Sequence, residues 1–372
     1  MKVLVTGGAG FIGSHLVDAL IQAGHDVCVF DSLEPQVHGA TGAPPAYLNA
    51  DARFVRGDVR DRDALAAVVG EADVVFHEAA AVGVGQSMYE IARYMDVNTG
   101  GTATLLDILA NDKHHVRKLL VASSMSVYGE GGYECGNCGT VAPELRREED
   151  LSTADWNPRC PQCLGPLKAI PTSESKPALP TSPYALSKLD QERLCLMIGR
   201  AYEIPTVALR YFNVYGPRQA LSNPYTGVAA IFASRMVNAN PPVVYEDGEQ
   251  TRDFVHVSDI VRANLRAMES PAGDFGIFNV GTGRPSSLLD LMGHLSRALG
   301  VDTEPEVTHQ FRAGDIRHCY SDPSLFETTY GFRPAVELAE GIKDVAAAAL
   351  QASPEDRFEA ASRELAQRRL TR

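Results

Sequence analysis

Short apolar runs alternate with amphipathic stretches through the first part of the chain. Apolar runs bounded by turn residues are typical of buried strands, and their alternation with helical patterns indicates a parallel sheet covered by helices. Between the first two runs, Ile12, Leu16, Leu20 and Ala23 fall on one helical face, and Gly24 is placed to end that helix. The expected strands are 3–6, 27–30, 54–56, 74–77 and 119–123.

This alternation predicts an α/β fold of the Rossmann type, with a doubly wound parallel sheet and a smaller C-terminal lobe. Residues 184–202 are expected to form a long helix and 206–209 a further strand. From about residue 131 to 180 the alternation breaks in a segment rich in Gly, Pro, Cys and charge, which we interpret as an insertion. The predicted division is 1–212 for the Rossmann domain, with the insertion at 131–170; 213–350 for a second lobe with segments that return to the first; and 351–372 for a peripheral C-terminal helix.

Composition narrows the possible functions. The 372 residues are 45% hydrophobic and 22% charged, which is enough to bury a sizeable core. The net charge of −13 argues against binding to nucleic acid or to a membrane surface, because both need clustered cations. No apolar stretch has the length of a signal peptide or a membrane helix, so we expect a cytoplasmic protein.

Three glycines lie between the first strand and the first helix. Gly7, Gly10 and Gly13 have the spacing that lets a backbone approach a pyrophosphate, while the N–H groups of the helix start at Phe11 and Ile12 point toward it. A glycine triplet alone could be a tight turn, but its setting between strand and helix predicts a dinucleotide site.

Two acidic residues follow the next strands. Asp31 ends the second strand, where a carboxylate can bind an adenosine ribose and repel a 2′-phosphate, which favours NAD over NADP. Asp58 and Val59 follow the third strand and are expected beside the adenine. Asp58 could also cap a helix.

The segment from Tyr184 to Lys188, preceded by 123–129, resembles the extended short-chain dehydrogenase/reductase family, and nearly the whole chain fits that pattern. Tyr184 and Lys188 share one helical face, so the ammonium can lower the phenol pKa toward neutrality and hold the nicotinamide ribose. Tyr184 then becomes the base, and Ser124 stabilises charge on the same substrate oxygen. A Tyr-x-x-x-Lys pair alone is more often a surface pair. Together with the glycines and the Ser-Ser strand end, it predicts catalysis.

The resemblance also implies substrate-binding residues. Asn213, in the segment 210–218, matches an asparagine that contacts the diphosphate of a nucleotide sugar. Arg252 and Arg312 match arginines that bind the diphosphate, and Asp315 matches an aspartate that binds a nucleotide ribose. Cys319 falls where sugar epimerases line the hexose pocket, and it could equally be a buried core cysteine.

The insertion contains two Cys-x-x-Cys pairs, Cys135 with Cys138 and Cys160 with Cys163. In a reduced compartment this is the ligand pattern of a tetrahedral structural zinc. Redox disulfides and coincidental turns are the alternatives. Four thiolates leave no open coordination position, so a stabilising role is predicted for the metal.

The predicted function is an NAD-dependent nucleotide-sugar 4-epimerase, an isomerase that oxidises and re-reduces C4. The run 77–87 and the insertion resemble bacterial dTDP-L-rhamnose 4-epimerases, which implies dTDP-L-rhamnose and dTDP-6-deoxy-L-talose as substrates. The alternatives are a nucleotide-sugar dehydratase, decarboxylase or reductase of the same fold, and a non-catalytic NAD-binding regulatory or scaffold protein. The family resemblance also implies a homodimer that pairs through helices around 98–109 and 184–202.

Overall fold

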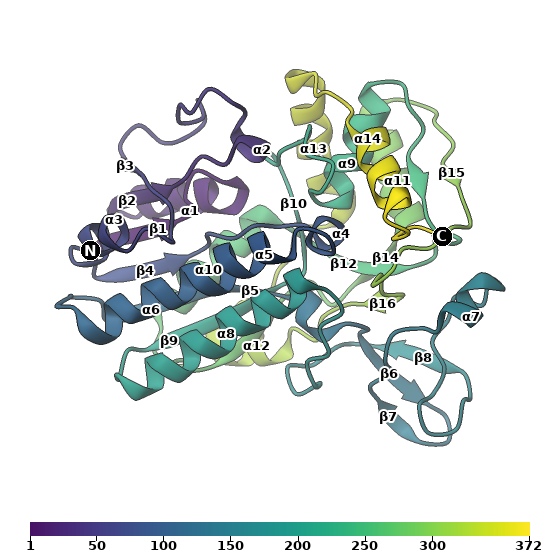
Figure 1. The fold of residues 1–372 in the computed structure, drawn as a ribbon, viewed down its shortest axis with the longest axis horizontal. Coiled ribbons are helices and arrows are strands. Elements are labelled where there is room, and N and C mark those ends of the chain that lie inside the picture. The colour runs from purple at the N-terminus through teal and green to yellow at the C-terminus, as the bar shows by residue number, and fades with distance from the viewer.

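A computed structural model describes residues 1–372. Its central sheet has seven parallel strands in the order β13-β9-β5-β4-β1-β2-β3 (Figure 1). The strands are β1 (Lys2–Thr6), β2 (Asp26–Asp31), β3 (Arg53–Arg56), β4 (Val74–His77), β5 (Lys118–Ser124), β9 (Thr206–Tyr211) and β13 (Ile277–Val280). Each strand expected from an apolar run is present, extended by at most two residues at an end. The chain order reverses between β1 and β4, and this reversal opens a crevice beyond their carboxyl ends.

Helices cover both faces of this sheet. One face carries α1 (Phe11–Gln22), α10 (Val257–Glu269) and α12 (Ser324–Tyr330), which share one apolar core with it. The other face carries α3 (Arg62–Val69), α6 (Gly101–Asn111) and α8 (Pro183–Ala201) over a second core. As predicted, α1 stops at Ala23, and Gly24 follows in a left-handed conformation with φ of +81°.

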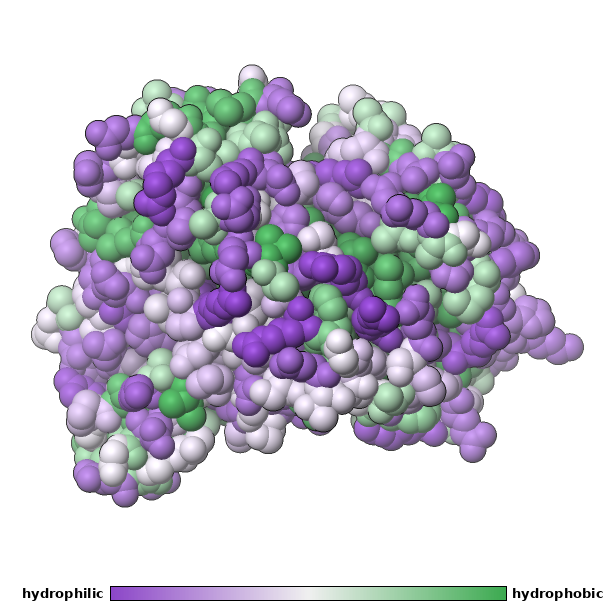
Figure 2. Space-filling view, turned by 180° about the vertical axis from the view of Figure 1, so that it is seen from behind, coloured by the Kyte–Doolittle hydropathy of each residue, from purple (hydrophilic) through white to green (hydrophobic).

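The second lobe has its own core between helices and short strands. Its helices are α9 (Val228–Val237), α11 (Leu288–Leu299), α13 (Leu338–Ala352) and α14 (Phe358–Gln367). Its strands are β10 (Asn213–Tyr215), β12 (Thr251–His256), β14 (Pro285–Ser287) and β16 (His318–Cys319) in one sheet, and β11 (Val243–Val244) and β15 (Glu306–Val307) in another. Figure 2, which views the molecule from behind, shows a notch between this lobe and the central sheet.

The insertion forms a three-stranded antiparallel sheet in the order β7-β6-β8. Its elements are β6 (Gly132–Cys135), β7 (Gly139–Val141), α7 (Glu148–Ser152) and β8 (Leu167–Ile170). Its buried core has four residues, two of them cysteines. Both ends of the insertion are joined to the β16 region, since the Gly131 N–H donates to the His318 oxygen and the Thr172 N–H to the Tyr320 oxygen, each at 2.8 Å.

Short segments follow the carboxyl ends of the central strands and shape the crevice there. They are α2 (Pro35–His38), α4 (Val84–Ser87), α5 (Ile91–Tyr94), the π-helical turn Met95–Gly100 and the 3₁₀ turn Met125–Tyr128. None of the helices has the length and apolar character needed to cross a membrane.

Candidate active site

A cavity of about 480 Å³ lies beyond the carboxyl ends of the central strands, where crevices of doubly wound sheets bind ligands. Half of its lining residues are hydrophobic, 22 of 44, so it combines apolar walls with a limited set of polar groups. The residues expected from the sequence that line it are Gly7, Gly10, Phe11, Ile12, Gly13, Asp31, Asp58, Val59, Ser124, Tyr184, Lys188 and Asn213.

The glycine turn is packed so closely against neighbouring backbone that it leaves no room for side chains. Gly7 has φ of +70°, and a Cβ there would come within 2.8 Å of the Ala79 backbone. A Cβ on Gly13 would collide with the Gly7 carbonyl oxygen. No side chain caps the N-terminus of α1, and its first turn carries no acidic residue. The first N–H groups of the helix therefore face the cavity with no protein partner, which fits a pyrophosphate.

The Asp31 carboxylate lies at the edge of this turn. It accepts hydrogen bonds from the Ala9 N–H at 3.0 Å and the Leu33 N–H at 2.9 Å, which fix its position against the glycine turn. Its side chain is almost fully buried, yet it borders the cavity. The carboxylate is thus already oriented to accept a hydrogen bond from a bound ribose hydroxyl, and its negative charge would repel a 2′-phosphate.

Asp58 lines the cavity from the end of β3. It pairs with the Arg60 guanidinium at 2.7 Å, which lowers the pKa of the Asp58 carboxyl. The alternative role as a helix cap is wrong, because Asp61 caps α3 by accepting the Ala64 N–H.

Tyr184 and Ser124 meet in the cavity. Burial raises the pKa of the Tyr184 phenol, and the nearby Ser124 hydroxyl opposes that rise. The Ser124 Oγ accepts hydrogen bonds from the Ser126 hydroxyl at 2.9 Å and from the Ser126 N–H at 3.2 Å. Because its acceptor sites are occupied in this way, the Ser124 hydroxyl proton is free to be donated into the cavity.

Lys188 is held beneath this pair, at the buried side of α8. Its ammonium donates to the Gln191 side-chain oxygen at 2.8 Å, and Gln191 donates to the Thr102 hydroxyl at 2.8 Å. The predicted lowering of the Tyr184 pKa by Lys188 is wrong for this geometry, because burial outweighs other influences on the phenol. Burial also lowers the pKa of Lys188 to about 8, while the Glu78 carboxylate raises it.

Glu78 is a cavity residue that sequence reasoning did not assign. It accepts a hydrogen bond from the Tyr211 hydroxyl at 2.8 Å. Burial raises the pKa of its carboxyl to about 7, against the lowering influence of Tyr211 and Lys188. The sequence could have indicated Glu78 as a site residue, because it directly follows β4, at the edge of the sheet where the cavity opens.

A buried ion pair fixes α8 against the sheet, and sequence reasoning missed this pair too. Arg210 of β9 forms two hydrogen bonds with Glu192 of α8, at 2.8 and 2.7 Å. Ser123, next to the predicted catalytic serine, donates to the same carboxylate at 2.7 Å. Both charged side chains are almost fully buried, so the pair must be well formed to offset its lost hydration.

The predicted substrate residues separate into two groups. Asn213 lines the cavity, and its buried side-chain oxygen has no hydrogen-bond partner in the protein. Arg252, Arg312, Asp315 and Cys319 do not line it. Arg252 instead donates to three backbone carbonyl oxygens, those of Thr251, Ile316 and Arg317.

Cys319 is 1% exposed and belongs to the central core. Its thiol lies 3.8 Å from the Thr172 hydroxyl, and burial raises the pKa of this thiol to about 12. The core interpretation of this cysteine therefore fits the structure better than a place in the hexose pocket. Arg312 and Asp315 pair with each other at 2.8 Å in the second lobe.

The four cysteines of the insertion come together. All their sulfur atoms lie within 4.8 Å of one another, and those of Cys135 and Cys163 are 3.5 Å apart. Zinc–sulfur bonds in tetrahedral geometry place sulfurs about 3.8 Å apart. The donor set and its spacing therefore fit one tetrahedral metal ion.

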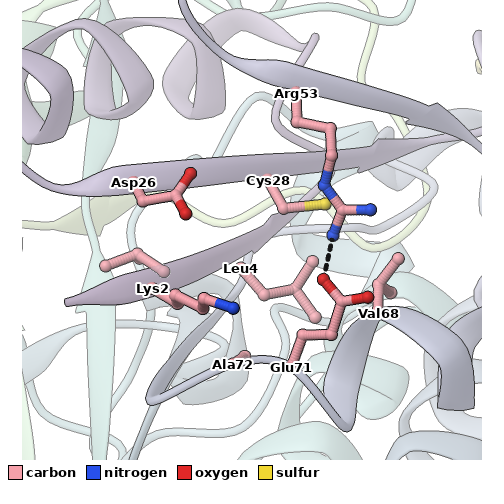
Figure 3. A pocket seen from close by; sticks show the side chains of 9 residues that line it. Lys2, Leu4, Asp26, Cys28, Arg53, Val68, Glu71 and Ala72 are labelled. Atoms are coloured by element: carbon pink, nitrogen blue, oxygen red, sulfur yellow. Dashed lines mark hydrogen bonds and ion pairs between the residues drawn. The ribbon is translucent and has the colours of Figure 1, made fainter.

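A second pocket lies at the opposite, amino-terminal end of the central strands (Figure 3). Lys2, Asp26 and Arg53 begin three neighbouring strands there, and Arg53 pairs with Glu71 at 2.8 Å. Its volume of about 30 Å³ holds little more than a water molecule. This pocket is too small for a nucleotide or a sugar.

Comparisons with known proteins agree with the geometry of the large cavity. Residues 3–281 match the model of the NAD dependent epimerase/dehydratase family. A dTDP-L-rhamnose 4-epimerase from Burkholderia thailandensis is 34% identical over 348 residues, covering 92% of this chain and 93% of that protein.

Two solved structures are also similar over nearly the whole chain. A UDP-glucose 4-epimerase from Thermotoga maritima, solved with UDP-glucose, is 33% identical with a TM-score of 0.77, covering 95% of this chain and 99% of that one. A UDP-glucuronic acid 4-epimerase from Bacillus cereus, solved with UDP-glucuronic acid and NAD, is 28% identical with a TM-score of 0.77, covering 95% and 100%.

Proposed function

The chain belongs to the NAD dependent epimerase/dehydratase family, and we propose that it is an NAD-dependent nucleotide-sugar 4-epimerase. The observation that carries this proposal is the meeting of Ser124, Tyr184 and Lys188 in one cavity with the uncapped start of α1. In the proposed division of labour, residues 1–212 hold the dinucleotide and 213–350 mainly hold the substrate. Residues 351–372 would form a peripheral C-terminal helix.

Bound NAD would supply the reversible hydride transfer that oxidises and re-reduces sugar C4. Gly7, Gly10 and the start of α1 would hold its pyrophosphate, and Asp31 its adenosine ribose. Asp58 and Val59 would border the adenine. These assignments use groups that the fold already leaves facing the cavity.

Tyr184 is the proposed proton carrier. It takes the proton of the C4 hydroxyl as the carbonyl forms, and it returns that proton to the same oxygen when the carbonyl is reduced. Ser124 donates a hydrogen bond to this oxygen, and Lys188, on the same helix as Tyr184, would hold the nicotinamide ribose. The Asn213 side-chain amide and the Arg312 guanidinium would donate to the nucleoside diphosphate, and Asp315 would accept from the nucleotide ribose.

Epimerisation is favoured over dehydration by the two residues next to Ser124 in the chain. The 4,6-dehydratases of this family carry an Asp-Glu pair at this strand end, which eliminates the C6 hydroxyl. Here the two positions are Met125 and Ser126. A thioether transfers no proton, and the Ser126 hydroxyl is hydrogen-bonded to Ser124. The end of β5 therefore lacks the acid–base pair used for elimination, while the cavity holds Ser124, Tyr184 and Lys188 for C4 oxidation.

The test is to incubate purified protein with UDP-, dTDP- and GDP-sugars and to analyse the products by mass spectrometry. C4 epimers of unchanged mass with no net NADH are expected. A product lighter by one water would indicate a dehydratase, and stoichiometric formation of NADH would indicate a dehydrogenase. Protein that binds NAD but turns over none of the sugars would indicate a regulatory protein. We propose dTDP-L-rhamnose and dTDP-6-deoxy-L-talose as the first pair to test, supported by the 34% identical relative.

We also propose a structural zinc held by Cys135, Cys138, Cys160 and Cys163. The support is the clustering of four thiols in a small sheet with only four buried core residues, which has little apolar burial of its own to stabilise it.

A homodimer through α6 and α8 is likewise proposed. Leu186, Met197 and Tyr202, in or next to α8, are exposed by 43%, 61% and 50%, and such an apolar surface is stabilised by a partner. Light scattering that gives the mass of one chain would refute this pairing.

A further inference from the structure

Part of the insertion leaves its small sheet and packs on the second lobe. This part, residues 144–157, lies between the two cysteine pairs and is named the insertion arm. Leu151 and Trp156 of the arm bury their side chains against Phe311 of the lobe. Figure 1 shows α7 of the arm below the C-terminus, and Arg372 forms an ion pair with Glu148 there. The insertion is therefore attached to the lobe through the segment that connects its two cysteine pairs.

Arg146 of the arm joins these parts through one guanidinium group. It donates to the Glu246 carboxylate at 2.9 Å, to the Trp156 carbonyl oxygen at 2.9 Å and to the Asp315 carbonyl oxygen at 3.0 Å. Its Nε lies 3.5 Å from the Glu130 carboxylate, at the root of the insertion. The side chain is 2% exposed, so this charge is stable only because its partners surround it.

The chain's last residues hold the same loop from another side. Phe311 and Arg372 exchange two backbone hydrogen bonds, at 2.8 and 3.0 Å. The Ala313 N–H donates to the Leu370 carbonyl oxygen at 2.9 Å. The loop 311–315 is thus paired along its backbone with residues 370–372 and bonded at its end to Arg146.

The side chains of this loop stay available for a ligand. Arg312 and Asp315 are 39% and 21% exposed. Only the Nε of Arg312 is used in their mutual bond, and the guanidinium lies 4.8 Å from the centre of the Tyr245 ring. Its outer N–H groups can therefore bind a phosphate in the forked geometry that arginine favours.

We infer that the insertion arm and residues 370–372 clamp the loop 311–315 in the position that binds the nucleoside diphosphate. This inference rests on the proposed function, in which Arg312 and Asp315 contact that part of the substrate. Arg146 is a positioning residue, because it holds the loop's backbone and leaves the binding side chains free. The insertion would then set nucleotide affinity in addition to stabilising itself.

The experiment titrates the NAD-loaded protein with UDP and with dTDP by calorimetry and measures KM and kcat for an accepted sugar nucleotide. In Arg146→Lys the charge beside Glu246 is kept, but an ammonium cannot make the same fork of bonds. Losing one charge-assisted bond to the loop should weaken nucleoside diphosphate binding about tenfold. KM should rise in proportion, while kcat and bound NAD stay at the wild-type level.

The matched control is Arg147→Lys, because Arg147 is the next residue, is 66% exposed and pairs only with Asp150. Arg147→Lys should change neither the affinity for UDP nor the affinity for dTDP. If Arg146→Lys loses NAD or its folded structure, the clamp is tested instead by deleting residues 370–372. This deletion should weaken nucleotide binding while NAD stays bound. Nucleotide affinity at the wild-type level in a folded Arg146→Lys protein or in that deletion would overturn the clamp. A wild-type protein that binds neither nucleotide and turns over no sugar would instead overturn the proposed function.

Discussion

Replacing Tyr184 by phenylalanine removes one oxygen from the cavity and leaves the ring in place. That ring packs edge-on against Tyr94, with 6.3 Å between the ring centres, and the contact survives. The lost hydroxyl lies near Ser124, whose Oγ keeps both of its bonds from Ser126. No buried polar atom loses its last partner, so the free energy of unfolding should fall by no more than about 1 kcal/mol.

Catalysis should respond far more strongly than stability. Without a phenolic oxygen there is no proton acceptor at the C4 hydroxyl, and loss of a positioned acid–base group lowers turnover by about a hundredfold to ten-thousandfold. This corresponds to a barrier higher by about 3 to 5 kcal/mol. The assay measures formation of the C4 epimer, with bound NAD and the thermal unfolding temperature recorded on the same protein.

Tyr94→Phe is the matched control, because it makes the same chemical change in the other ring of the pair. The Tyr94 hydroxyl is fully buried and lies 3.0 Å from the Val82 carbonyl oxygen and 3.2 Å from the Gln86 side-chain oxygen. Its loss should cost about 1 to 3 kcal/mol of stability with most turnover retained. If Tyr184→Phe turns over sugar nearly as fast as the wild type while holding NAD, Tyr184 is not the proton carrier.

Three further predictions concern the cofactor, the metal and the pH profile. Wild-type protein should bind NAD in preference to NADP, and Asp31→Asn should narrow this preference because the negative charge is lost, together with one of the two acceptors for the Ala9 and Leu33 N–H groups. A titration that shows the wild type preferring NADP would refute the role of Asp31. Elemental analysis should find about one zinc per chain, and Cys138→Ser should lose it and lower the unfolding temperature; metal-free protein of full stability would refute the site. The Lys188 charge is lost as pH rises through its pKa of about 8, so kcat should fall on that alkaline side. Glu78 raises this pKa, so Glu78→Gln should shift the fall to lower pH; an unshifted profile would show that the two groups are not coupled.

The central sheet and the glycine turn could be predicted because both depend on short-range patterns. An apolar run such as Val74–His77 can be buried on both faces only inside a sheet covered by helices. The start of the catalytic helix is also local, since Ser182 accepts the Ala185 N–H and Pro183 occupies the first turn. Each of these features is determined within a few residues of sequence.

The contacts that place the catalytic groups connect distant residues, and these could not be predicted. Arg210 and Glu192 hold α8 against β5 and β9, but a sequence shows two charged residues without showing that they are buried together. Arg252 illustrates the same limit. An arginine can satisfy its donors with phosphate oxygens or with backbone carbonyls, and the fold surrounds this one with three carbonyls.

The difference between features set by local sequence and features set by distant contacts affects how substrate choice is encoded. In our proposal the C4 chemistry uses Ser124, Tyr184 and Lys188, which lie on elements of the central sheet and its helices. Nucleotide binding instead depends, in our proposal, on the loop 311–315, whose position is fixed by the insertion arm and the chain's end. A change in the arm can therefore alter nucleotide affinity without touching the proton transfer. The catalytic motif thus identifies the reaction class, whereas the nucleotide preference should depend on the residues around Arg146.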